Sequence, residues 1–271
     1  VKQIKNTNFG YNILVRGSQY FDARNILICT GGHPSGRKLA NSLGHSIVQP
    51  VPSLFSLCDS GNTLESCSGI TLNVNIRLTV SKHKYTETGT ILITHKGFSG
   101  PVVLRLSAFS ARKLHANKYI GELKINWLCM NESEVRSIIE LYKLENGSKL
   151  VFNNKPFNQL PKSLWKTLLL NEKINSKLKW CDLSRYEKEF LVKCLIMKSY
   201  SITSRGPFGD EFVTAGGVSL KEINFKTMES KICKGLFFAG EILDIDGVTG
   251  GFNFQHCWTS GWIAGKSVAS N

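Results

Sequence analysis

No run of about 18 consecutive apolar residues occurs in this 271-residue sequence, so no segment is long and apolar enough to cross a membrane as a helix. The first residues also lack the charged start and apolar core of a secretory signal peptide. We therefore expect a cytoplasmic protein with no membrane partner. Hydrophobic residues make up 42% of the chain, which is enough for a substantial globular core.

Closely spaced metal ligands are missing as well. The eight cysteines include no C-x-x-C pair, and no pair of nearby histidines accompanies them. Zinc sites and redox dithiols use such spacings, so we predict neither, and we interpret the cysteines as buried thiols in a reducing compartment. Asp244 and Asp246 lie on a loop without a third ligand or the spacing of an EF-hand. We predict no metal and assign these two acids to loop-stabilising turns.

Acidic residues are few. The chain carries 34 Lys and Arg against 20 Asp and Glu, a net charge of +14. Such an excess is typical of nucleic-acid-binding proteins. Its distribution argues against that interpretation, because it forms no block of five or six like charges and is absent from residues 206–271, which hold 5 basic and 7 acidic residues. We therefore expect a solvated basic surface rather than a nucleic-acid partner.

A distinctive glycine loop lies near the C-terminus. Residues 235–253 read Gly-Leu-Phe-Phe-Ala-Gly-Glu-Ile-Leu-Asp-Ile-Asp-Gly-Val-Thr-Gly-Gly-Phe-Asn, an apolar strand followed by an acidic, glycine-rich loop and the start of a helix. At Gly250 and Gly251 no Cβ blocks a close approach to the backbone, and the helix start directs its N–H groups and positive dipole end to the same place. We predict a site for an electron-rich or anionic group. We expect Gly261 and Gly265 on the face of the helix that packs on a sheet.

A second glycine turn lies far upstream. Residues 26–29 are a continuous apolar run, as expected of a strand covered on both faces, and Thr30-Gly31-Gly32 follows. Residues 37–43 then predict a short helix that Gly44 ends. Strand, glycine turn and helix at both ends of the chain are typical of a nucleotide-binding α/β domain.

Between the two glycine turns the period of the sequence changes twice. Residues 70–81 alternate between apolar and polar, which predicts a strand with one buried face and one solvent-exposed face. Residues 85–93, 102–106 and 120–127 read as further short strands, so we predict a small antiparallel barrel or sandwich.

From Asn131 onward the period is helical. Asn131 and Ser184 each stand three residues before a Glu, as in a capping box, and Pro161 suits the first position of a helix. The predicted domains are 1–48 with 206–271, an inserted barrel at 49–130, and a helical subdomain with a return strand at 131–205.

These blocks together resemble one known family. Residues 235–253, with Ala-Gly-Gly-Val at 215–218, Thr-Met-Glu-Ser-Lys at 227–231, Cys-Thr-Gly-Gly at 29–32 and Thr-His-Lys-Gly-Phe-Ser-Gly-Pro at 94–101, are similar to the BaiN-like family of NAD(P)/FAD-dependent oxidoreductases. That family includes YhiN-like, aminoacetone-oxidase-like and bile-acid-reductase-like proteins. The order and separation of the blocks agree over nearly the whole chain.

The resemblance implies an FAD-dependent oxidoreductase that acts on a small-molecule substrate, with NAD(P)H as one candidate electron donor. It implies no catalytic residue. By resemblance, Glu241 stands where many flavoproteins place an Asp that binds the ribityl chain. The residues placed beside FAD are Thr30, Gly31, Gly32, Gly240, Glu241, Asp246, Gly250, Gly251, Phe252 and Asn253.

One element of the family is missing from the sequence. Members open with a strand, a G-x-G-x-x-G turn and a helix that cradle the FAD pyrophosphate, and this sequence has no such motif and begins at Val1. The expected fold is therefore an incomplete α/β FAD/NAD(P)-binding fold with an inserted β-barrel and a small helical subdomain. We expect the chain to be a fragment that alone binds FAD weakly.

Several alternatives stay open. His95 lies either beside the flavin or substrate, or in a turn where it satisfies backbone groups, and His256 faces either the cofactor or the packed sheet. The function has two rivals: a non-enzymatic binding module that kept a flavoprotein scaffold, and a basic nucleic-acid-binding protein.

Overall fold

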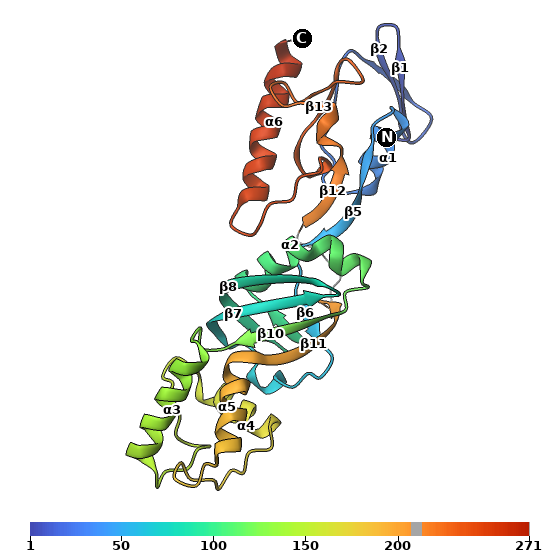
Figure 1. The fold of residues 1–271 in the computed structure, drawn as a ribbon. Coiled ribbons are helices and arrows are strands. Elements are labelled where there is room, and N and C mark those ends of the chain that lie inside the picture. Colours follow the sequence, from blue (N-terminus) through green and yellow to red (C-terminus); the bar gives the residue numbers. More distant parts are fainter. Residues whose placement is uncertain (207–212, 271) are drawn as a thin grey trace. The chain divides into compact units, whose positions relative to one another are not determined.

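The computed structural model describes residues 1–206 and 213–270, and Figure 1 labels many of its helices and strands. The chain divides into two compact units, Val1–Ser53 with Glu211–Asn271 and Leu54–Asp210. We call them the end unit and the middle unit, because both ends of the chain meet in the first. No helix in the described part of the chain has the length and apolarity needed to span a bilayer.

The end unit contains two sheets. Strands β1, β2 and β3 form an antiparallel sheet in that order. The second sheet has the order β13–β14–β15–β4, in which β4 and β15 are parallel and the other neighbours are antiparallel. The bounds are β1 Gln3–Thr7, β2 Gly10–Leu14, β3 Tyr20–Ala23, β4 Ile26–Ile28, β13 Ile223–Asn224, β14 Glu229–Ser230 and β15 Leu236–Phe238.

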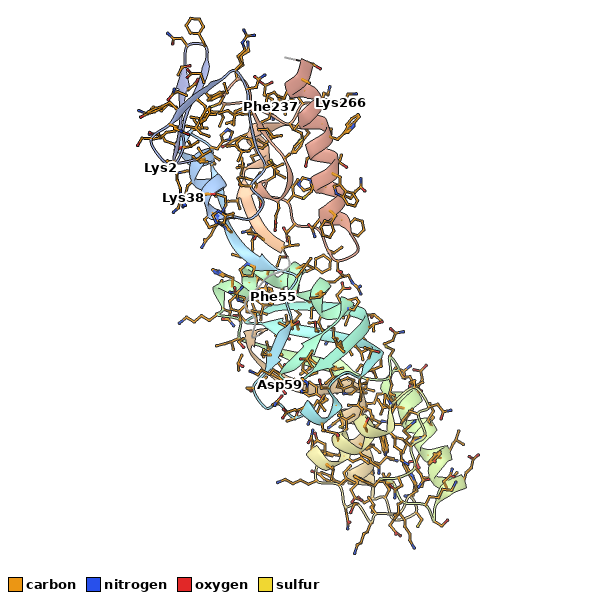
Figure 2. All side chains as sticks on the ribbon, turned by 180° about the vertical axis from the view of Figure 1, so that it is seen from behind. Lys2, Lys38, Phe55, Asp59, Phe237 and Lys266 are labelled. Atoms are coloured by element: carbon orange, nitrogen blue, oxygen red, sulfur yellow. The ribbon has the colours of Figure 1, made fainter. Side chains whose placement is uncertain are left out.

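Helices and a two-stranded ribbon complete the end unit. All three residues of β15 are buried in the core of this unit, and Figure 2 marks Phe237 there and Lys266 on the last helix. The ribbon pairs β5 and β12 antiparallel. The bounds are α1 Pro34–Ser42, β5 Ile47–Ser53, β12 Val213–Val218, the 3₁₀ helices η2 Leu220–Glu222 and η3 Gly240–Ile242, and α6 Phe252–Ser270.

Helix α1 begins three residues before its predicted start. His33 caps it, because its Nδ1 accepts a hydrogen bond from the backbone N–H of Ser35 at 3.2 Å, and Pro34 occupies the first turn. A histidine cap followed by proline carries little sequence signal, whereas Gly44 does follow the helix as expected.

The middle unit is built on a closed barrel of six antiparallel strands in the order β10–β11–β6–β9–β8–β7. The predicted alternation is present on β7, where Val74, Ile76 and Leu78 are buried and the residues between them are more exposed. The bounds are β6 Leu57–Asp59, the 3₁₀ helix η1 Glu65–Cys67, β7 Thr71–Val80, β8 His83–Thr94, β9 Gly97–Ser99, β10 Gly121–Asn126 and β11 Lys198–Arg205.

Residues 102–106 are helical, and the strand predicted there is wrong. They belong to α2, Pro101–Ala116, which follows Gly100 and has Pro101 in its first turn. Five mostly apolar residues are too few to distinguish a strand from a helix, and the period over a longer segment decides. The buried residues recur at three- and four-residue spacing, and they are Val102, Val103, Leu106, Ser107, Ser110, Ala111 and Leu114.

Three helices follow the barrel strand β10. They are α3 Glu132–Asn146, α4 Lys162–Asn171 and α5 Arg185–Met197. Both predicted capping boxes are confirmed, with Asn131 and Ser184 accepting from the N–H of the Glu three residues on. Pro161 is the N-cap of α4 rather than its first residue. The helix therefore begins at Lys162, one residue later than predicted.

Two expectations about buried residues need correction. In α6 the buried positions are Ser260 and Ala264, whereas a Cβ at Gly261 or Gly265 would meet nothing within 4 Å in residues 1–206 and 213–270, so those glycines do not form the packing face. The packed face is offset by one residue, about 100° around the helix. The thiols are also not uniformly buried, because Cys29, Cys129 and Cys181 are exposed.

Candidate functional site

The parallel pair β4 and β15 brings the two predicted glycine loops to one edge of a sheet. Phe238 lies opposite Ile28 in register, and the N–H of Ala239 donates to the carbonyl of Ile28 at 3.2 Å. Because both strands end here, Thr30 and Gly240 begin loops that leave the same edge. The carboxyl ends of parallel strands are where α/β proteins bind their ligands.

Glu241 connects these loops to the β5–β12 ribbon. Its Oε1 accepts a hydrogen bond from the backbone N–H of Thr214 at 2.7 Å. Its other oxygen, Oε2, lies 3.7 Å from the position that a Cβ on Gly31 would occupy. The carboxylate therefore stands between β12 and the upstream glycine turn, and one of its oxygens is already used by the protein.

The upstream turn is held tightly. Gly31 has φ +60°, a left-handed conformation that favours glycine. At Gly32 an added Cβ would lie 2.7 Å from Oγ1 of Thr214, and its carbonyl accepts from Nη1 of Arg37 at 2.5 Å. The backbone conformation of the turn is thus restrained by Thr214 of β12 on one side and by Arg37 of α1 on the other.

Side chains of the downstream loop also bind within the protein. Asn253 closes the loop on Gly247, because its Oδ1 accepts from the N–H of Gly247 at 2.7 Å and its Nδ2 donates to the carbonyl at 2.9 Å. Oδ2 of Asp246 accepts from Oγ of Ser53 at 3.0 Å. The amide and at least one carboxylate oxygen predicted beside the cofactor therefore hold the loop in shape.

The start of α6 is open on the side of Gly251. This glycine has φ +89°, and a Cβ built on it would have no atom of the described residues within 4 Å, so packing against those residues does not explain its small size. Gly250 precedes it, also with positive φ, and the ring of Phe252 is 59% exposed just beyond. The backbone N–H groups of the first helical turn point outward at this place. An electron-rich group of a planar ligand fits such an arrangement.

Two further residues support the downstream loop, and one of them was missed in the sequence. Oγ of Ser260 accepts from the N–H of Gly240 at 2.9 Å, and Nε2 of His256 lies 3.2 Å from the carbonyl of the same glycine. His256 therefore faces the loop at Gly240. Helical spacing from His256 to Ser260 was the available signal, whereas nothing in the sequence pointed to Thr214 or Ser53.

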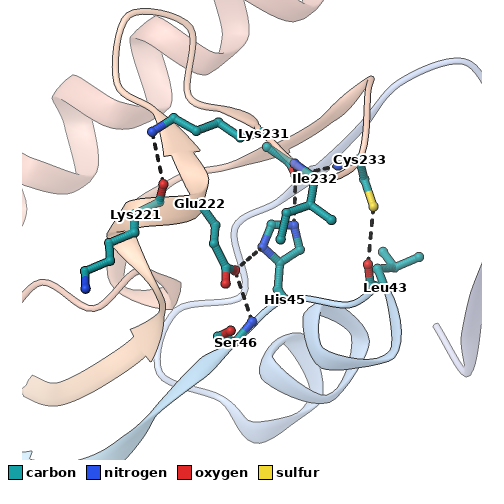
Figure 3. Close-up of polar contacts among 9 residues, drawn as sticks. Leu43, His45, Ser46, Lys221, Glu222, Lys231, Ile232 and Cys233 are labelled. Atoms are coloured by element: carbon teal, nitrogen blue, oxygen red, sulfur yellow. Dashed lines mark hydrogen bonds and ion pairs between the residues drawn. The ribbon is translucent and has the colours of Figure 1, made fainter.

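A separate buried cluster surrounds His45 in the end unit (Figure 3). Nδ1 of His45 lies 2.9 Å from Oε2 of Glu222, and Nε2 lies 2.9 Å from Oγ of Ser230. The ring is 1% exposed and packs edge-on against Phe238 at 4.8 Å between centroids. Burial lowers the pKa of His45, although its hydrogen bond and charge interaction with Glu222 oppose the change.

This cluster has the residue types of a hydrolase triad, but its serine is used differently. Oγ of Ser230 accepts from the backbone N–H groups of Ile232 and Cys233 at 2.9 and 2.8 Å, and the residue is buried. The arrangement joins the segment between α1 and β5 to η2 and β14 through hydrogen bonds, so it is a structural connection within the end unit.

The remaining candidates lie elsewhere. His95 is exposed in the turn between β8 and β9 of the middle unit. The N–H of Asp244 donates to the carbonyl of Val218 at 3.0 Å, which ties its loop to β12. Within residues 1–206 and 213–270, no group of three or more His, Cys, Asp and Glu is placed to hold a metal ion.

Comparison with known proteins identifies relatives over nearly the full chain. The model of the family described as HI0933-like protein Rossmann domain matches residues 1–267. The chain is 28% identical over 278 residues to the 3-dehydro-bile acid delta(4,6)-reductase of Clostridium scindens, covering 99% of this chain and 68% of that protein.

Two further relatives carry a different name. The chain is 29% identical over 291 residues to the ribosomal RNA dihydrouridine synthase of Haemophilus influenzae, covering 99% of this chain and 66% of that protein. It is 26% identical over 257 residues to the ribosomal RNA dihydrouridine synthase of Escherichia coli, covering 90% and 60%. The chain thus spans 60–68% of the lengths of these three relatives.

Proposed function

The chain belongs to the family of HI0933-like Rossmann-domain proteins, and from this membership we propose that it acts in an FAD-dependent oxidoreductase of the reductase type. The flavin-facing site would be the edge of the end unit where β4 and β15 stop. An oxidoreductase function is supported by the relative named as a reductase.

The observation that carries the proposal is the parallel register of β4 and β15. It places the turn at residues 30–32 and the loop at residues 240–253 together, although about 200 residues of chain separate them. The open backbone at Gly251 and the start of α6 lie on the downstream loop. A sheet edge with two glycine loops and a helix start is the setting in which a dinucleotide binds.

The residues present fit a flavin at this place. Gly251 leaves room that no atom of the described residues fills within 4 Å of its Cβ position, and the N–H groups of the first turn of α6 offer donors and a positive dipole end to an electron-rich ring edge. Asn253 and Asp246 keep the loop in shape through Gly247 and Ser53, so their role would be to position the backbone. Bound FAD would supply hydride chemistry, with NAD(P)H as the proposed electron donor.

The names of the relatives suggest a reaction class. A delta(4,6)-reductase of a 3-dehydro bile acid acts on ring double bonds near a keto group, and dihydrouridine is uridine with hydrogen added across a ring double bond. Both reactions add a hydride and a proton across a carbon–carbon double bond conjugated with a carbonyl. We propose the same class of reaction for this protein. The proton would come from solvent or from a group on the side of the flavin where the substrate binds.

The test is flavin retention and reduction. The protein is purified in the form that its gene encodes, with added FAD, and its visible spectrum is recorded before and after anaerobic addition of NADPH or NADH. The expected result is bound flavin that bleaches with at least one of the two nucleotides. The reduced protein is then reoxidised with an α,β-unsaturated ketone or with uridine-containing RNA, to identify the acceptor.

A protein that retains no flavin under any of these conditions would exclude the oxidoreductase. That result would favour the rival function, a binding module that keeps a flavoprotein scaffold without its cofactor. Flavin that binds but is not reduced by either nucleotide would leave the site standing and overturn only the electron donor.

A further inference from the structure

Net positive charge is concentrated in one stretch of the middle unit, because acidic residues are scarce there. Residues 66–121 contain eight Lys or Arg and a single acidic residue, Glu87. That carboxylate is engaged by Arg105, whose Nε lies 3.1 Å from Oε2. The stretch forms β7, β8, β9 and α2, so the charge belongs to one part of the barrel and the helix on it.

The fold gathers part of this charge around one point. Oγ of Ser81, in the turn between β7 and β8, donates to Oδ1 of Asn117 at the end of α2 at 3.3 Å. The neighbouring residues Lys82 and Lys118 are therefore brought together, although 36 positions separate them. Lys84 follows on β8 and Lys113 on the last turn of α2. We call Lys82, Lys84, Lys113 and Lys118 the basic face.

These four side chains are available for a partner. Each residue is exposed, and none makes an ion pair with a residue in the described part of the chain. No acidic residue lies in the β7–β8 turn or on α2. A group of like charges without ion-pair partners in the protein favours a polyanion, because binding releases the small counterions that otherwise surround both surfaces.

An aromatic residue adjoins the basic face. Phe109 lies four residues before Lys113 on α2, which puts the two on the same side of the helix, and it is 55% exposed. Exposed aromatic rings beside lysines are the means by which proteins stack single-stranded bases while neutralising the backbone. An acidic protein would use the charges but would not need a stacking ring, whereas a lipid surface also accommodates an exposed Phe, so vesicle binding is one outcome of the test.

We propose that the basic face and Phe109 bind single-stranded RNA. The proposal rests on the reductase function for its biological purpose, since two relatives are named for a reaction on ribosomal RNA. It runs against the expectation drawn from the linear charge distribution. That expectation considered runs of like charge along the chain, whereas the Ser81–Asn117 contact joins charges that are far apart in sequence.

The first experiment measures binding of a labelled single-stranded oligoribonucleotide of mixed sequence to the full chain without FAD, at several salt concentrations. Replacing Lys82, Lys113 and Lys118 with Gln should weaken binding. It should also reduce the slope of log Kd against log salt by about 2, since each contact with single-stranded phosphate contributes about 0.7. The matched control replaces the exposed Lys162, Lys177 and Lys179 with Gln, which makes the same change in net charge.

The second experiment separates stacking from charge. Phe109→Ala should weaken binding of the single strand about tenfold without changing the salt slope, and it should not affect binding of duplex RNA. A general loss of folding would affect all of these quantities, and circular dichroism of each variant checks for it.

Three outcomes would overturn the proposal. The control triple variant could lose as much affinity as the basic-face variant, which would show that only net charge matters. Phe109→Ala could leave single-strand affinity unchanged. The chain could bind vesicles containing phosphatidylserine through the same lysines and not bind RNA. Flavin retention is measured separately on each variant. If the protein retains flavin but does not bind RNA, only the proposed RNA-binding role of the basic face is refuted. If it binds RNA but retains no flavin, only the proposed oxidoreductase function is refuted.

Discussion

Glu241 and Thr214 are joined by a hydrogen bond of 2.7 Å from the backbone N–H of Thr214 to Oε1 of Glu241. It connects the loop after β15 to the buried strand β12, and Thr214 is only 7% exposed. The carboxylate that the sequence assigns to the ribityl chain is thus also a support of the protein itself. The two roles are separable by mutation.

Replacing Glu241 with Ala should leave the N–H of Thr214 buried without an acceptor. We expect the free energy of unfolding to fall by about 1–3 kcal/mol, whereas Glu241→Gln keeps an acceptor and should cost less. Urea denaturation of the two variants measures the difference. If both variants are as stable as the wild type, the hydrogen bond does not hold the loop.

Gly251→Val should abolish flavin retention, because φ +89° is strained for valine and because the branched side chain would enter the open space at the start of α6 that we assign to the ring. The matched control is Gly17→Val, at which φ is +86° and an added Cβ likewise meets no described atom within 4 Å, but which lies between β2 and β3. The control carries the same kind of backbone strain and should retain flavin. The visible absorbance of the purified variants decides, and flavin retained in Gly251→Val would remove this loop from the site.

The stability of the end unit should depend on pH through His45. Burial lowers its pKa in the fold, so the unfolded chain binds a proton more readily than the folded chain. The contribution is therefore fully present above the unfolded value of about 6.5, and it is lost as the pH falls from there toward the folded pKa. We expect the free energy of unfolding to decrease on acidification through this window.

Comparison with His45→Gln tests this linkage. The variant should be less stable near neutral pH, because a buried hydrogen-bonded ring is lost, but it should show a weaker decrease on acidification. His95→Gln, which changes an exposed residue of the other unit, serves as the control and should follow the wild type. Identical pH profiles for wild type and His45→Gln would show that other groups cause the acid sensitivity.

Local signals in the sequence predicted much of the fold. The capping boxes at Asn131 and Ser184 are confirmed because their hydrogen bonds span only three residues. The strand predicted at residues 102–106 failed because five residues are too few to establish a period. The glycines of α6 were placed on the wrong face because small size was taken as a sign of burial, whereas Ser260 and Ala264 fill that position.

Only the backbone features of the candidate site, and not its side-chain contacts, were predictable from the sequence. Glycines and the helix start at residue 252 leave a pattern within a few residues, and the family resemblance reinforces it. The partners of Glu241 and Asp246, which are Thr214 and Ser53, lie 27 and 193 residues away in the sequence. Such contacts depend on the pairing of β5 with β12, which no local pattern encodes.

The outer face of α6 predicts that the 271-residue polypeptide will self-associate. Phe254, Trp258 and Trp262 follow each other at four-residue intervals, so they form one stripe, and each is 66–69% exposed. Phe254 stacks on Trp258 at 6.2 Å between centroids, and Nζ of Lys266 lies 4.4 Å from the Trp262 ring. Contiguous aromatic surface of this kind rarely stays exposed to water.

Sedimentation velocity over a range of concentrations measures this association. The wild-type chain should shift to larger species as its concentration rises, and Trp258→Gln with Trp262→Gln should shift much less. Replacing Tyr186 with Gln is the control, because this ring is 78% exposed on α5 but belongs to the middle unit. Since each buried aromatic side chain contributes about 1.5–3 kcal/mol, two tryptophans account for a change in affinity of several orders of magnitude. A wild-type chain that stays monomeric at high concentration would show that the aromatic stripe stays exposed to water without causing self-association.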